Sequence, residues 1–578
     1  MDSEALRLCG TDEPVPTLRT LRAGALTLEL QAGRLRRIRC GGHEVWHGLA
    51  FVLRDPDWGT PEAEWREESV HEHADGFEVE VDGRWAIGVG YTLRLRGDAH
   101  GLHVEAEATV EADVSINRLG LCLMHPLSAC GARVEVRHVD GRTSASTFPD
   151  HIPPWPPFML VRALRHEWAP GRWAEAELHG DLYESEDQRN NGDASFKTYS
   201  RSNMAPRPYT LAAGTVVRQS AVLRVDPTAV ANEPAGTAEP TTPPTVTVRI
   251  GAATGPLPPV GVEVHAADAI VPALPDALRE LRPAHLHLAW RPGAAVAWAG
   301  ISAMLGAAGA RLRLDVHGAD ADALHTLAQA LAAAGITLES LAVFPSTTAA
   351  VAAARTAFPG TPVGGGTPHF FVQLSRLDDL GPVDYASCTT SALVHGADDD
   401  DVMAGLASLP AMVRSWRARH PDIPLRMGPN GIAMRSSPLG AQPASDGTRR
   451  LALAAVDPRS RAQYGAAWML GHVAALAGAG VQAITLADLA GPSGVVGVAG
   501  GHMTRRPAFD VLRCLGRPAL RRACTVSHPE RVAALALERD GRTVLLLANL
   551  TAGPQTVHVE GPSQAPLRLG PYAVHLAR

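Results

Sequence analysis

The sequence feature that most constrains the fold is a change of rhythm after about residue 245. Beyond this point short apolar runs alternate with alanine-rich segments of helical periodicity, such as 320–334 and 402–417. Strands that alternate with helices form parallel sheets, and eight such units over roughly 250 residues are what a TIM barrel requires. The eight predicted strands are Val260–His265, Ala284–Trp290, Arg311–His317, Leu338–Phe344, Phe370–Leu374, Val383–Ser387, Leu425–Pro429 and Val481–Asp488.

A doubly wound open sheet is the alternative for these units, but no GxGxxG motif follows a predicted strand. The regions on either side of the barrel read as β structure. Residues 1 to about 240 alternate apolar and polar residues, as in 25–30 and 77–81, which predicts a large antiparallel β-sandwich. From about residue 518, runs such as 543–550 predict a small C-terminal β domain.

These patterns predict three domains and one linker. The N-terminal β-sandwich takes residues 1–231, and a Pro/Thr-rich stretch at 232–245 has the composition of a linker. The TIM-barrel domain takes 246–515, and the C-terminal β domain takes 516–578.

Composition excludes several classes of function. The net charge of −7 is spread along the chain without a basic stripe, which argues against a nucleic-acid partner. The N-terminus lacks the apolar core of a signal peptide, and His472, Gln482 and Asp488 interrupt the apolar region at 466–490, which argues against a membrane span. Seven cysteines without a CxxC pair suit reduced thiols in a cytoplasmic protein. We expect no cofactor, and the sequence carries no signal for an oligomeric state.

Lys197 is the only lysine in the chain, and arginine supplies the rest of the Lys+Arg total of 53. A lysine that survives such a bias suggests a site where the two residues are not equivalent, because lysine is a compact ammonium and arginine a planar fork. The surrounding segment, from Glu184 to Tyr199, is the densest run of varied polar groups in the chain.

Period-two spacing in this segment predicts shared faces. Glu184 and Glu186 should share a face with Leu178 and Leu182, and Lys197 should share one with Ser195 and Tyr199. Burial raises a carboxyl pKa and a nearby cation lowers it, so such a pair can diverge into an acid and a base. The alternative is a salt-bridged hairpin that braces the sandwich.

In the barrel, chemistry is expected at the carboxyl ends of the strands. The candidates are His265, His317, Gln373, His395 and Asp488, of which Asp488 ends the last strand before a Gly-Pro-Ser-Gly loop. His395 is a candidate for proton transfer. The acidic run at 398–401 is interpreted as an ordinary helix N-terminus, where carboxylates suit the helix dipole.

Metal binding and serine catalysis find less support. Two HxH pairs, His71/His73 and His285/His287, place imidazoles on one face of a strand, and His265 or His317 could add a third ligand to the second pair. No HExxH motif is present, so no metal is expected. A GxSxG elbow for a nucleophilic serine is absent as well.

The chain resembles the D-apionate lactonases, which hydrolyse a sugar-acid lactone in apiose catabolism. The resemblance is densest at Glu186-Asp-Gln-Arg-Asn190 and Asp193-Ala-Ser-Phe-Lys-Thr-Tyr199, and it spans nearly the whole chain. It implies hydrolysis of D-apionolactone, or a near relative, to the open acid. The other matching segments are 117–126, 138–141, 148–153, 362–367, 394–398, 464–468 and 546–551.

Three positions depart from the family pattern. Asn191-Gly192 stands where the pattern has Trp-Thr, and Gln373 and Asp488 each stand where it has glutamate. Glutamine at position 373 cannot act as an acid or a base, as a glutamate there could. Aspartate at position 488 has a shorter side chain than glutamate, so its carboxylate oxygens lie about one bond length from where those of glutamate would be. Displacements of about 1 Å can cost about a hundredfold in rate, so the departures imply a different lactone or a weakened enzyme.

Lactone hydrolysis requires deprotonation of water, stabilisation of an oxyanion and protonation of the ring oxygen. We expect the site where the sandwich meets the barrel mouth. The expected general base is Glu186 or Asp187, Lys197 and Arg189 stabilise the oxyanion, and Tyr199 or His395 donates the proton. Substrate contacts are expected from Glu184, Arg189, Asn190, Asp193, Gln373 and Asp488.

Two other functions fit the same domain order. A TIM-barrel glycoside hydrolase would use two carboxylates about 5–10 Å apart. A non-catalytic relative would bind carbohydrate without turnover. Small sugar lactones are the expected partners of the enzyme.

Overall fold

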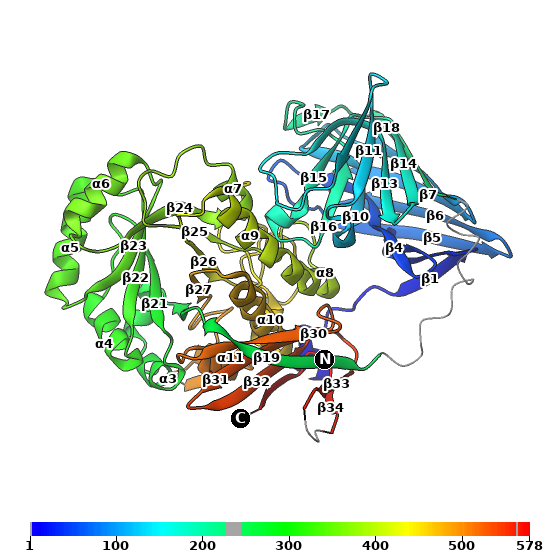
Figure 1. The fold of residues 1–578 in the computed structure, drawn as a ribbon. Helices are drawn as coiled ribbons and strands as arrows, with labels where there is room; N and C mark the ends of the chain where they lie inside the picture. The colour runs from blue at the N-terminus through cyan, green and yellow to red at the C-terminus, as the bar shows by residue number, and fades with distance from the viewer. Residues whose placement is uncertain (1–2, 227–243, 501, 562–564, 578) are drawn as a thin grey trace.

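The computed structural model describes residues 3–226, 244–500, 502–561 and 565–577, which form three domains (Figure 1). An N-terminal antiparallel sandwich, a closed barrel of eight strands and a small C-terminal sheet follow one another, as the sequence predicts. The predicted linker at 232–245 lies outside the described residues except for its last two positions. Among the described helices, none combines the length and apolarity that a membrane span requires.

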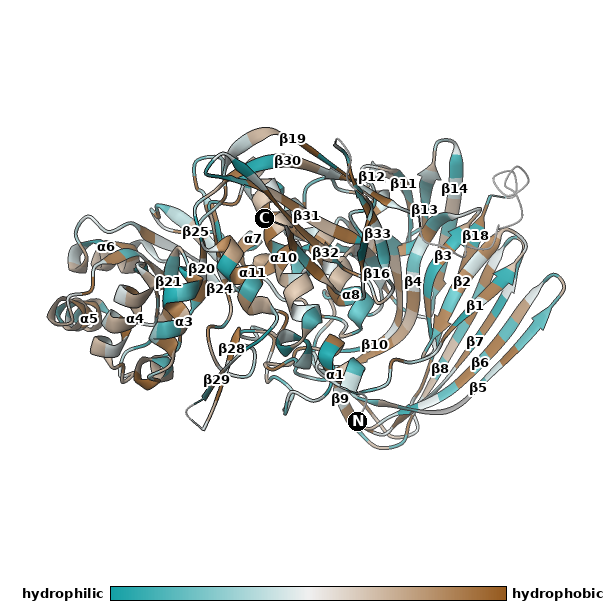
Figure 2. Ribbon diagram, turned by 90° about the horizontal axis from the view of Figure 1, so that it is seen from below, coloured by the Kyte–Doolittle hydropathy of each residue, from teal (hydrophilic) through white to brown (hydrophobic). Residues whose placement is uncertain are grey.

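The N-terminal domain is one large antiparallel sheet that folds over an apolar core. Alternate residues of its strands are buried, and brown and teal bands alternate along β5 to β8 in Figure 2. A strand in which every second side chain is apolar must cover a core with that face, which is why the sheet doubles back on itself. The strands of the large sheet are β1 (Leu18–Ala23), β2 (Leu26–Gln31), β3 (Arg34–Cys40), β4 (His43–Arg54), β5 (Ala63–His73), β6 (Gly76–Trp85), β7 (Val89–Asp98), β8 (Gly101–Val110), β10 (Arg118–Pro126), β11 (Arg133–His138), β12 (Thr143–Thr147), β13 (Phe158–Ala169), β14 (Arg172–His179), β15 (Tyr183–Asp187), β16 (Ser195–Tyr199) and β18 (Val216–Val225). Strands β9 (Val114–Ile116) and β17 (Tyr209–Leu211) form a separate pair.

The central domain is a TIM barrel whose eight strands pair in chain order and close on themselves. The strands are β20 (Val260–Glu263), β21 (His285–Trp290), β22 (Arg311–His317), β23 (Leu338–Phe344), β24 (Val363–Phe370), β25 (Tyr385–Thr389), β26 (Leu425–Asn430) and β27 (Ala483–Leu486). Short strands β28 (Val496–Ala499) and β29 (His502–Arg505) form a hairpin after them. The helices are η3 (Ala266–Ile270), α3 (Leu274–Leu281), α4 (Trp298–Ala308), α5 (Ala321–Ala333), α6 (Thr348–Ala357), α7 (Phe371–Ser375), α8 (Asp399–Ala404), η4 (Gly405–Ser408), α9 (Leu409–Arg419), η5 (Pro458–Arg461), α10 (Gln463–Ala479) and α11 (Ala508–Leu515).

The fifth barrel strand does not lie where the sequence predicts it. The strand is Val363–Phe370, and most of the predicted strand Phe370–Leu374 is instead the short helix α7. Three glycines at 364–366 hide the true strand, because glycine has low strand propensity. The barrel needs glycine here, since a Cβ at Gly364 would overlap the ring of Tyr385. Gln373 therefore lies in a helix and not at a strand end.

The C-terminal sheet includes one strand from before the barrel. Strand β19 (Val246–Pro256) pairs with β30 (Leu520–Val526) and β33 (Gln555–Val559). The sequence assigns residue 246 to the barrel domain, whereas the barrel begins at β20. The sheet is completed by β31 (Val532–Arg539), β32 (Arg542–Asn549), β34 (Leu567–Leu569) and β35 (Val574–Ala577), and it packs on α10. The N-terminal helix α1 (Ser3–Cys9) also packs on α10 and not on the sandwich.

Ion pairs join the sandwich to the barrel. Arg34 and Arg36 on β3 contact Asp398 and Asp401, and Arg37 contacts Asp400, at 2.6–2.9 Å. The acidic run is the N-terminus of α8, as the sequence predicts, and it also receives this row of arginines. Charge complementarity of this kind fixes how two surfaces meet.

Candidate active site

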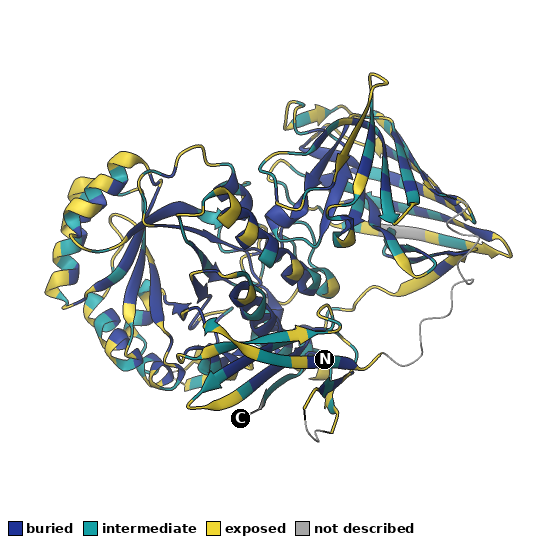
Figure 3. Cartoon of the chain, viewed as in Figure 1, coloured by how far each residue is buried: buried dark blue, intermediate teal, exposed yellow. Residues whose placement is uncertain are grey.

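Lys197 lies in a buried hairpin of the sandwich that faces the barrel. Strands β15 and β16 are buried along their whole length (Figure 3). Their antiparallel register sets Glu186 directly opposite Lys197, so the two side chains project from the same face. Lys197 is 3% exposed and Glu186 is 7% exposed, and their charged atoms are 3.1 Å apart.

The turn of this hairpin is docked on the barrel. It consists of the 3₁₀ helix η2 (Gln188–Asn191), which the Asp187 side chain caps and Gly192 ends with a φ of 98°. A left-handed residue without a side chain is required here, because a Cβ on Gly192 would lie 2.6 Å from the carbonyl oxygen of Ser391. The backbone of the sandwich thus touches the loop that follows β25.

His395, in that same loop, completes the group around Lys197. Its Nε2 atom is 3.2 Å from Lys197 Nζ, and its Nδ1 atom is 2.6 Å from the Asp193 carboxylate. An ammonium can only donate, so Nε2 accepts from Lys197 and Nδ1 carries the hydrogen that Asp193 accepts. Side chains from both large domains therefore share one hydrogen-bond network.

The electrostatics separate the roles of these groups. Burial alone raises the pKa of Glu186, but attraction to the charges of Lys197 and Arg376 and the hydrogen bond from Lys197 outweigh it and lower the pKa to about 2. Burial lowers the pKa of His395, and the charge of Lys197 lowers it further, against the opposing effect of Asp193. Glu186 is consequently a fixed carboxylate at neutral pH, whereas His395 is a neutral imidazole.

A cavity of about 120 Å³ borders this network. Lys197, His395, Asp193 and Gln188 line one side, and two arginines, Arg54 and Arg118, also line it. A larger cavity of about 550 Å³ shares Arg54 and His395 with it. The sequence did not identify Gln188, Arg54 or Arg118 as candidates, and among 52 arginines it offered no signal for the last two.

Other predicted residues form contacts of their own behind this cavity. Asp187 pairs with Arg189 at 2.7 Å, and Arg189 also donates to the carbonyl oxygen of Pro149. Burial raises the pKa of Asp187 in spite of this arginine. Neither residue of the pair lines the cavity.

Tyr199 and Glu184 form a second buried pair. The hydroxyl of Tyr199 donates to Glu184 at 2.5 Å, and burial raises its pKa well above the usual value. Glu184 does not share one strand face with Leu178 and Leu182, as the sequence predicts. Leu178 lies in β14, and Leu182 is an exposed residue between β14 and β15. Turn geometry at 180–182 interrupts the period-two pattern.

Asn190 and Gln373 flank the group from two sides. Asn190 donates to Glu186 at 3.3 Å. Gln373 in α7 has a buried side-chain oxygen with no hydrogen-bond partner among the described residues. Arg376, at the end of the same helix, contacts Glu186 at 3.4 Å.

Asp488 belongs to a different cluster at the barrel mouth. It lies 2.9 Å from His265 and 2.9 Å from Arg435, and Arg435 also contacts Glu263. The hydrogen bond with Asp488 raises the pKa of His265. No contact joins Asp488 to the Lys197 group in the part of the chain that the structure describes.

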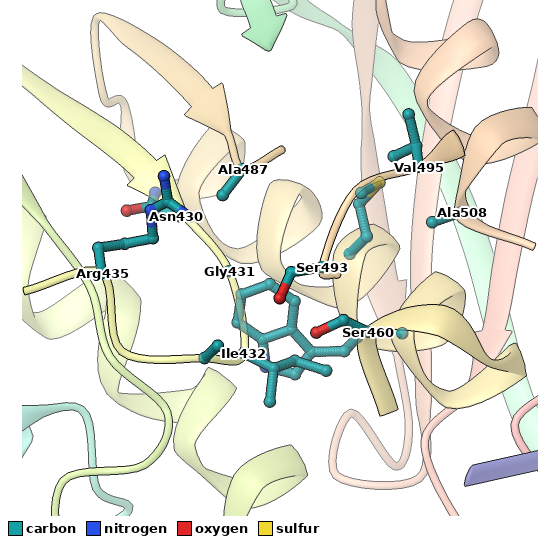
Figure 4. Close-up of a pocket in the computed structure, with 13 residues that line it drawn as sticks. Asn430, Gly431, Ile432, Arg435, Ser460, Ala487, Ser493, Val495 and Ala508 are labelled. Carbon is teal, nitrogen blue, oxygen red and sulfur yellow. The ribbon is translucent and has the colours of Figure 1, made fainter. Parts of the chain in front are cut away.

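The cavity beside this second cluster is small. Arg435, Asn430 and Ser493 line it (Figure 4), and it measures about 20 Å³. Such a volume holds about one water molecule and excludes a sugar. The cavity next to Lys197, at about 120 Å³, is the larger of the two.

The histidines considered as metal ligands are dispersed. Within the HxH pair on β21, His285 bonds Thr485 at 2.8 Å and His287 lies 3.1 Å from Asp315. The ligand atoms of Glu263, His265 and Asp488 lie within 4.8 Å of one another. Arg435 already holds both carboxylates of this trio, so a cation occupies the place that a metal ion would take. His317, at the end of its strand, lies beside the Phe344 ring, with the ring centroids 5.3 Å apart and the planes tilted.

Comparison with known proteins gives matches along almost the whole chain. Models of the D-apionate lactonase N-terminal domain, TIM barrel domain and C-terminal immunoglobulin-like domain match residues 6–228, 260–519 and 529–577. A D-apionate lactonase of Brucella anthropi is 32% identical over an alignment of 610 positions that covers 98% of each chain.

Solved structures are more distant. A family 51 α-L-arabinofuranosidase from Bifidobacterium longum is 13% identical, with a TM-score of 0.41 over 58% of this chain and 95% of its own. A family 30 endoxylanase from Clostridium papyrosolvens is 15% identical, with a TM-score of 0.37 over 55% of this chain and 89% of its own. Likeness at this level carries no argument about activity.

Proposed function

Because the chain belongs to the D-apionate lactonase family and is accordingly a lactone hydrolase, we propose that its substrate is D-apionolactone or a closely related sugar-acid lactone. The observation that supports a site at the sandwich–barrel interface is the contact of Lys197 with His395 beside a cavity of suitable size. Family membership favours this function over a glycoside hydrolase and over a non-catalytic sugar-binding protein.

His395 is the general base of the proposed mechanism. Asp193 orients the imidazole through Nδ1 and leaves Nε2 as the basic atom. A general base must be unprotonated at the working pH, and burial together with the charge of Lys197 lowers the pKa of His395 so that its imidazole is free to take a proton. Glu186, with a pKa of about 2, holds its proton too weakly for that role and instead fixes the position of Lys197.

Lys197 stabilises the oxyanion. Its ammonium is a compact donor, 3.2 Å from His395 Nε2, so an oxygen atom that lies beside this contact can be within hydrogen-bond distance of both groups. Water adds to the lactone carbonyl carbon while Nε2 takes a proton, and Lys197 donates to the carbonyl oxygen as its negative charge develops. The bond from this carbon to the ring oxygen then breaks, and imidazolium returns the proton to the ring oxygen. The product is a hydroxy acid, which ionises to a carboxylate and a proton.

The proposal is tested by acid release from D-apionolactone in a pH-stat. We expect turnover by the native protein and a loss of about a hundredfold in Lys197→Arg, because the guanidinium cannot place a compact donor between Glu186 and His395. His395→Gln should lose about 10²–10⁴-fold. His528→Gln in the C-terminal domain, far along the chain from the site, is the matched control. Unaltered turnover in Lys197→Arg would show that Lys197 has no role in the mechanism. No turnover by the native protein would show that D-apionolactone is not the substrate.

A further inference from the structure

We infer that Arg54 and Arg118 form a carboxylate-binding site, and that the group they hold is the carboxylate of the ring-opened sugar acid. This inference rests on the proposed function. It adds two substrate-binding residues and specifies an anionic product as their ligand.

The two arginines lie side by side in the wall of the sandwich. Arg54 ends β4 and Arg118 begins β10, and the register of these strands places the two residues directly opposite each other. Arg54 is 8% exposed and Arg118 is 6% exposed. Like charges directly opposite each other on neighbouring strands repel, so this arrangement is unfavourable in the absence of an anion.

Neither guanidinium has a carboxylate partner in the described part of the chain. Arg54 donates to Thr60 and to the carbonyl oxygen of His395, the latter at 3.2 Å. Arg118 donates to Asn203 at 3.1 Å and lies over the Tyr199 ring at 3.9 Å, and its Nε–H is buried without a hydrogen-bond partner. By contrast, Arg34 and Arg36 on the same wall each pair with an aspartate.

The carboxylates that line the same cavity are already engaged. Asp193 is bound by His395 at 2.6 Å, and Asp401 is bound by Arg36 at 2.6 Å. Burial and the repulsion of Arg118 together lower the pKa of Arg54 to about 10. Attraction to Asp193 and Asp55 opposes these effects without outweighing them, so the buried guanidinium is only partly neutralised, and a bound anion would remove the remaining penalty.

The chemistry of hydrolysis supplies such an anion at this place. Lactone and water are neutral, whereas the ring-opened acid ionises, so a carboxylate arises from the carbon on which Lys197 and His395 act. Arg54 contacts the backbone of His395 itself. The planar fork of arginine matches the two oxygens of a carboxylate, which a neutral lactone does not offer.

Calorimetric titration with D-apionate tests the inference. The native protein should bind this acid, and Arg54→Gln and Arg118→Gln should each weaken binding by about tenfold or more, the usual value of a hydrogen bond to a charged group. Arg218→Gln, which alters an exposed arginine on β18 paired with Glu107, is the matched control and should bind as the native protein does. The neutral alditol of the same carbon skeleton and inorganic phosphate are titrated in parallel.

Thermal unfolding provides the second measurement. D-Apionate should raise the melting temperature of the native protein and of Arg218→Gln, and at the same concentration should raise that of the two cavity variants by less. This ligand-induced shift is compared within each variant, so a change in its basal stability does not affect the result. Arg118→Lys keeps the charge without the fork and should bind D-apionate less tightly than the native protein.

Three outcomes would overturn the inference. The first is native protein that binds D-apionate no better than the alditol. The second is an equal loss of binding in the Arg218→Gln control. The third is phosphate binding as tight as that of D-apionate, which would indicate a general anion site. Lactone turnover without D-apionate binding would reject this inference alone, whereas D-apionate binding without lactone turnover would reject the proposed hydrolysis alone.

Discussion

Replacement of Glu186 by glutamine tests whether the ion pair with Lys197 is buried as described. The pKa of Glu186 is about 2 in the folded protein and 4.5 in its reference state. This lowering of the pKa corresponds to about 3 kcal/mol of stability at neutral pH. This agrees with the loss of about 3–5 kcal/mol that is usual when one partner of a buried pair is removed. We therefore expect Glu186→Gln to lower the free energy of unfolding by about 3 kcal/mol at pH 7.

The pH dependence of this loss is a stricter test. A carboxyl group whose pKa is depressed by folding stabilises the protein fully above its unfolded pKa, here 4.5, and loses this effect as pH falls towards its folded pKa, here about 2. Linkage predicts that the difference in stability between the native protein and Glu186→Gln shrinks by about 1 kcal/mol between pH 6 and pH 3.5. Urea unfolding of both proteins at several pH values, followed by tryptophan fluorescence, measures it.

Glu167→Gln is the matched control for this experiment. Glu167 is also ion-paired, and its pKa is also lowered to about 2 by hydrogen bonds from Arg133 and Gly171, but its pair with Arg133 faces solvent. Solvent screens such a pair, so a smaller loss of stability is expected. A loss in Glu186→Gln that equals the control, or one that does not change with pH, would refute a buried and ionised Glu186.

The remaining predictions concern His395 and the hairpin turn. Because the pKa of His395 is lowered, the rate of lactone hydrolysis should hold down to a pH below 6.5 and fall only as the imidazole gains a proton; a pH–rate profile measures this. Asp193→Asn removes the carboxylate that raises the pKa of His395, so the acid limb should move to still lower pH, and a move to higher pH would contradict the assigned network. Gly192→Ala places a Cβ in a left-handed residue against Ser391, and should cost about 1–3 kcal/mol in a thermal or urea melt together with most of the activity; native stability in this variant would argue against the described docking of the hairpin.

The domain architecture could be predicted because it depends on periodicity. Alternation of apolar residues specifies a folded-over sheet, and repeated strand–helix units specify a closed barrel. The predicted strands and domain bounds differ from the structure where close packing or sheet pairing, and not local periodicity, decides the fold. The sequence does not predict the fifth strand because its three glycines have low strand propensity. Glycine is needed at 364 because a Cβ there would overlap the ring of Tyr385. Strand β19 was assigned to the barrel because nothing in a single strand indicates which sheet it will join.

The site could be predicted only in part. The lone lysine and its acidic neighbours indicate the hairpin, whereas the register that sets Glu186 opposite Lys197 comes from the structure. Its contact with His395 joins residues 198 positions apart, and no local pattern encodes such a distance. The sequence places Asp488 with the hairpin because it ends the last predicted barrel strand, where active sites of this fold gather, yet Asp488 is bound to His265 and Arg435. Arg54 and Arg118 differ from the other arginines only in what surrounds them.

The network around Lys197 joins residues of two domains, which has a consequence for the synthesis and folding of the chain. In the proposed mechanism, Lys197 is synthesised nearly two hundred residues before His395, so a nascent chain that ends between them carries only part of the proposed catalytic group. Hydrolysis would then require the central domain to fold and to pack against the sandwich. We therefore expect a chain truncated between the two residues to be inactive.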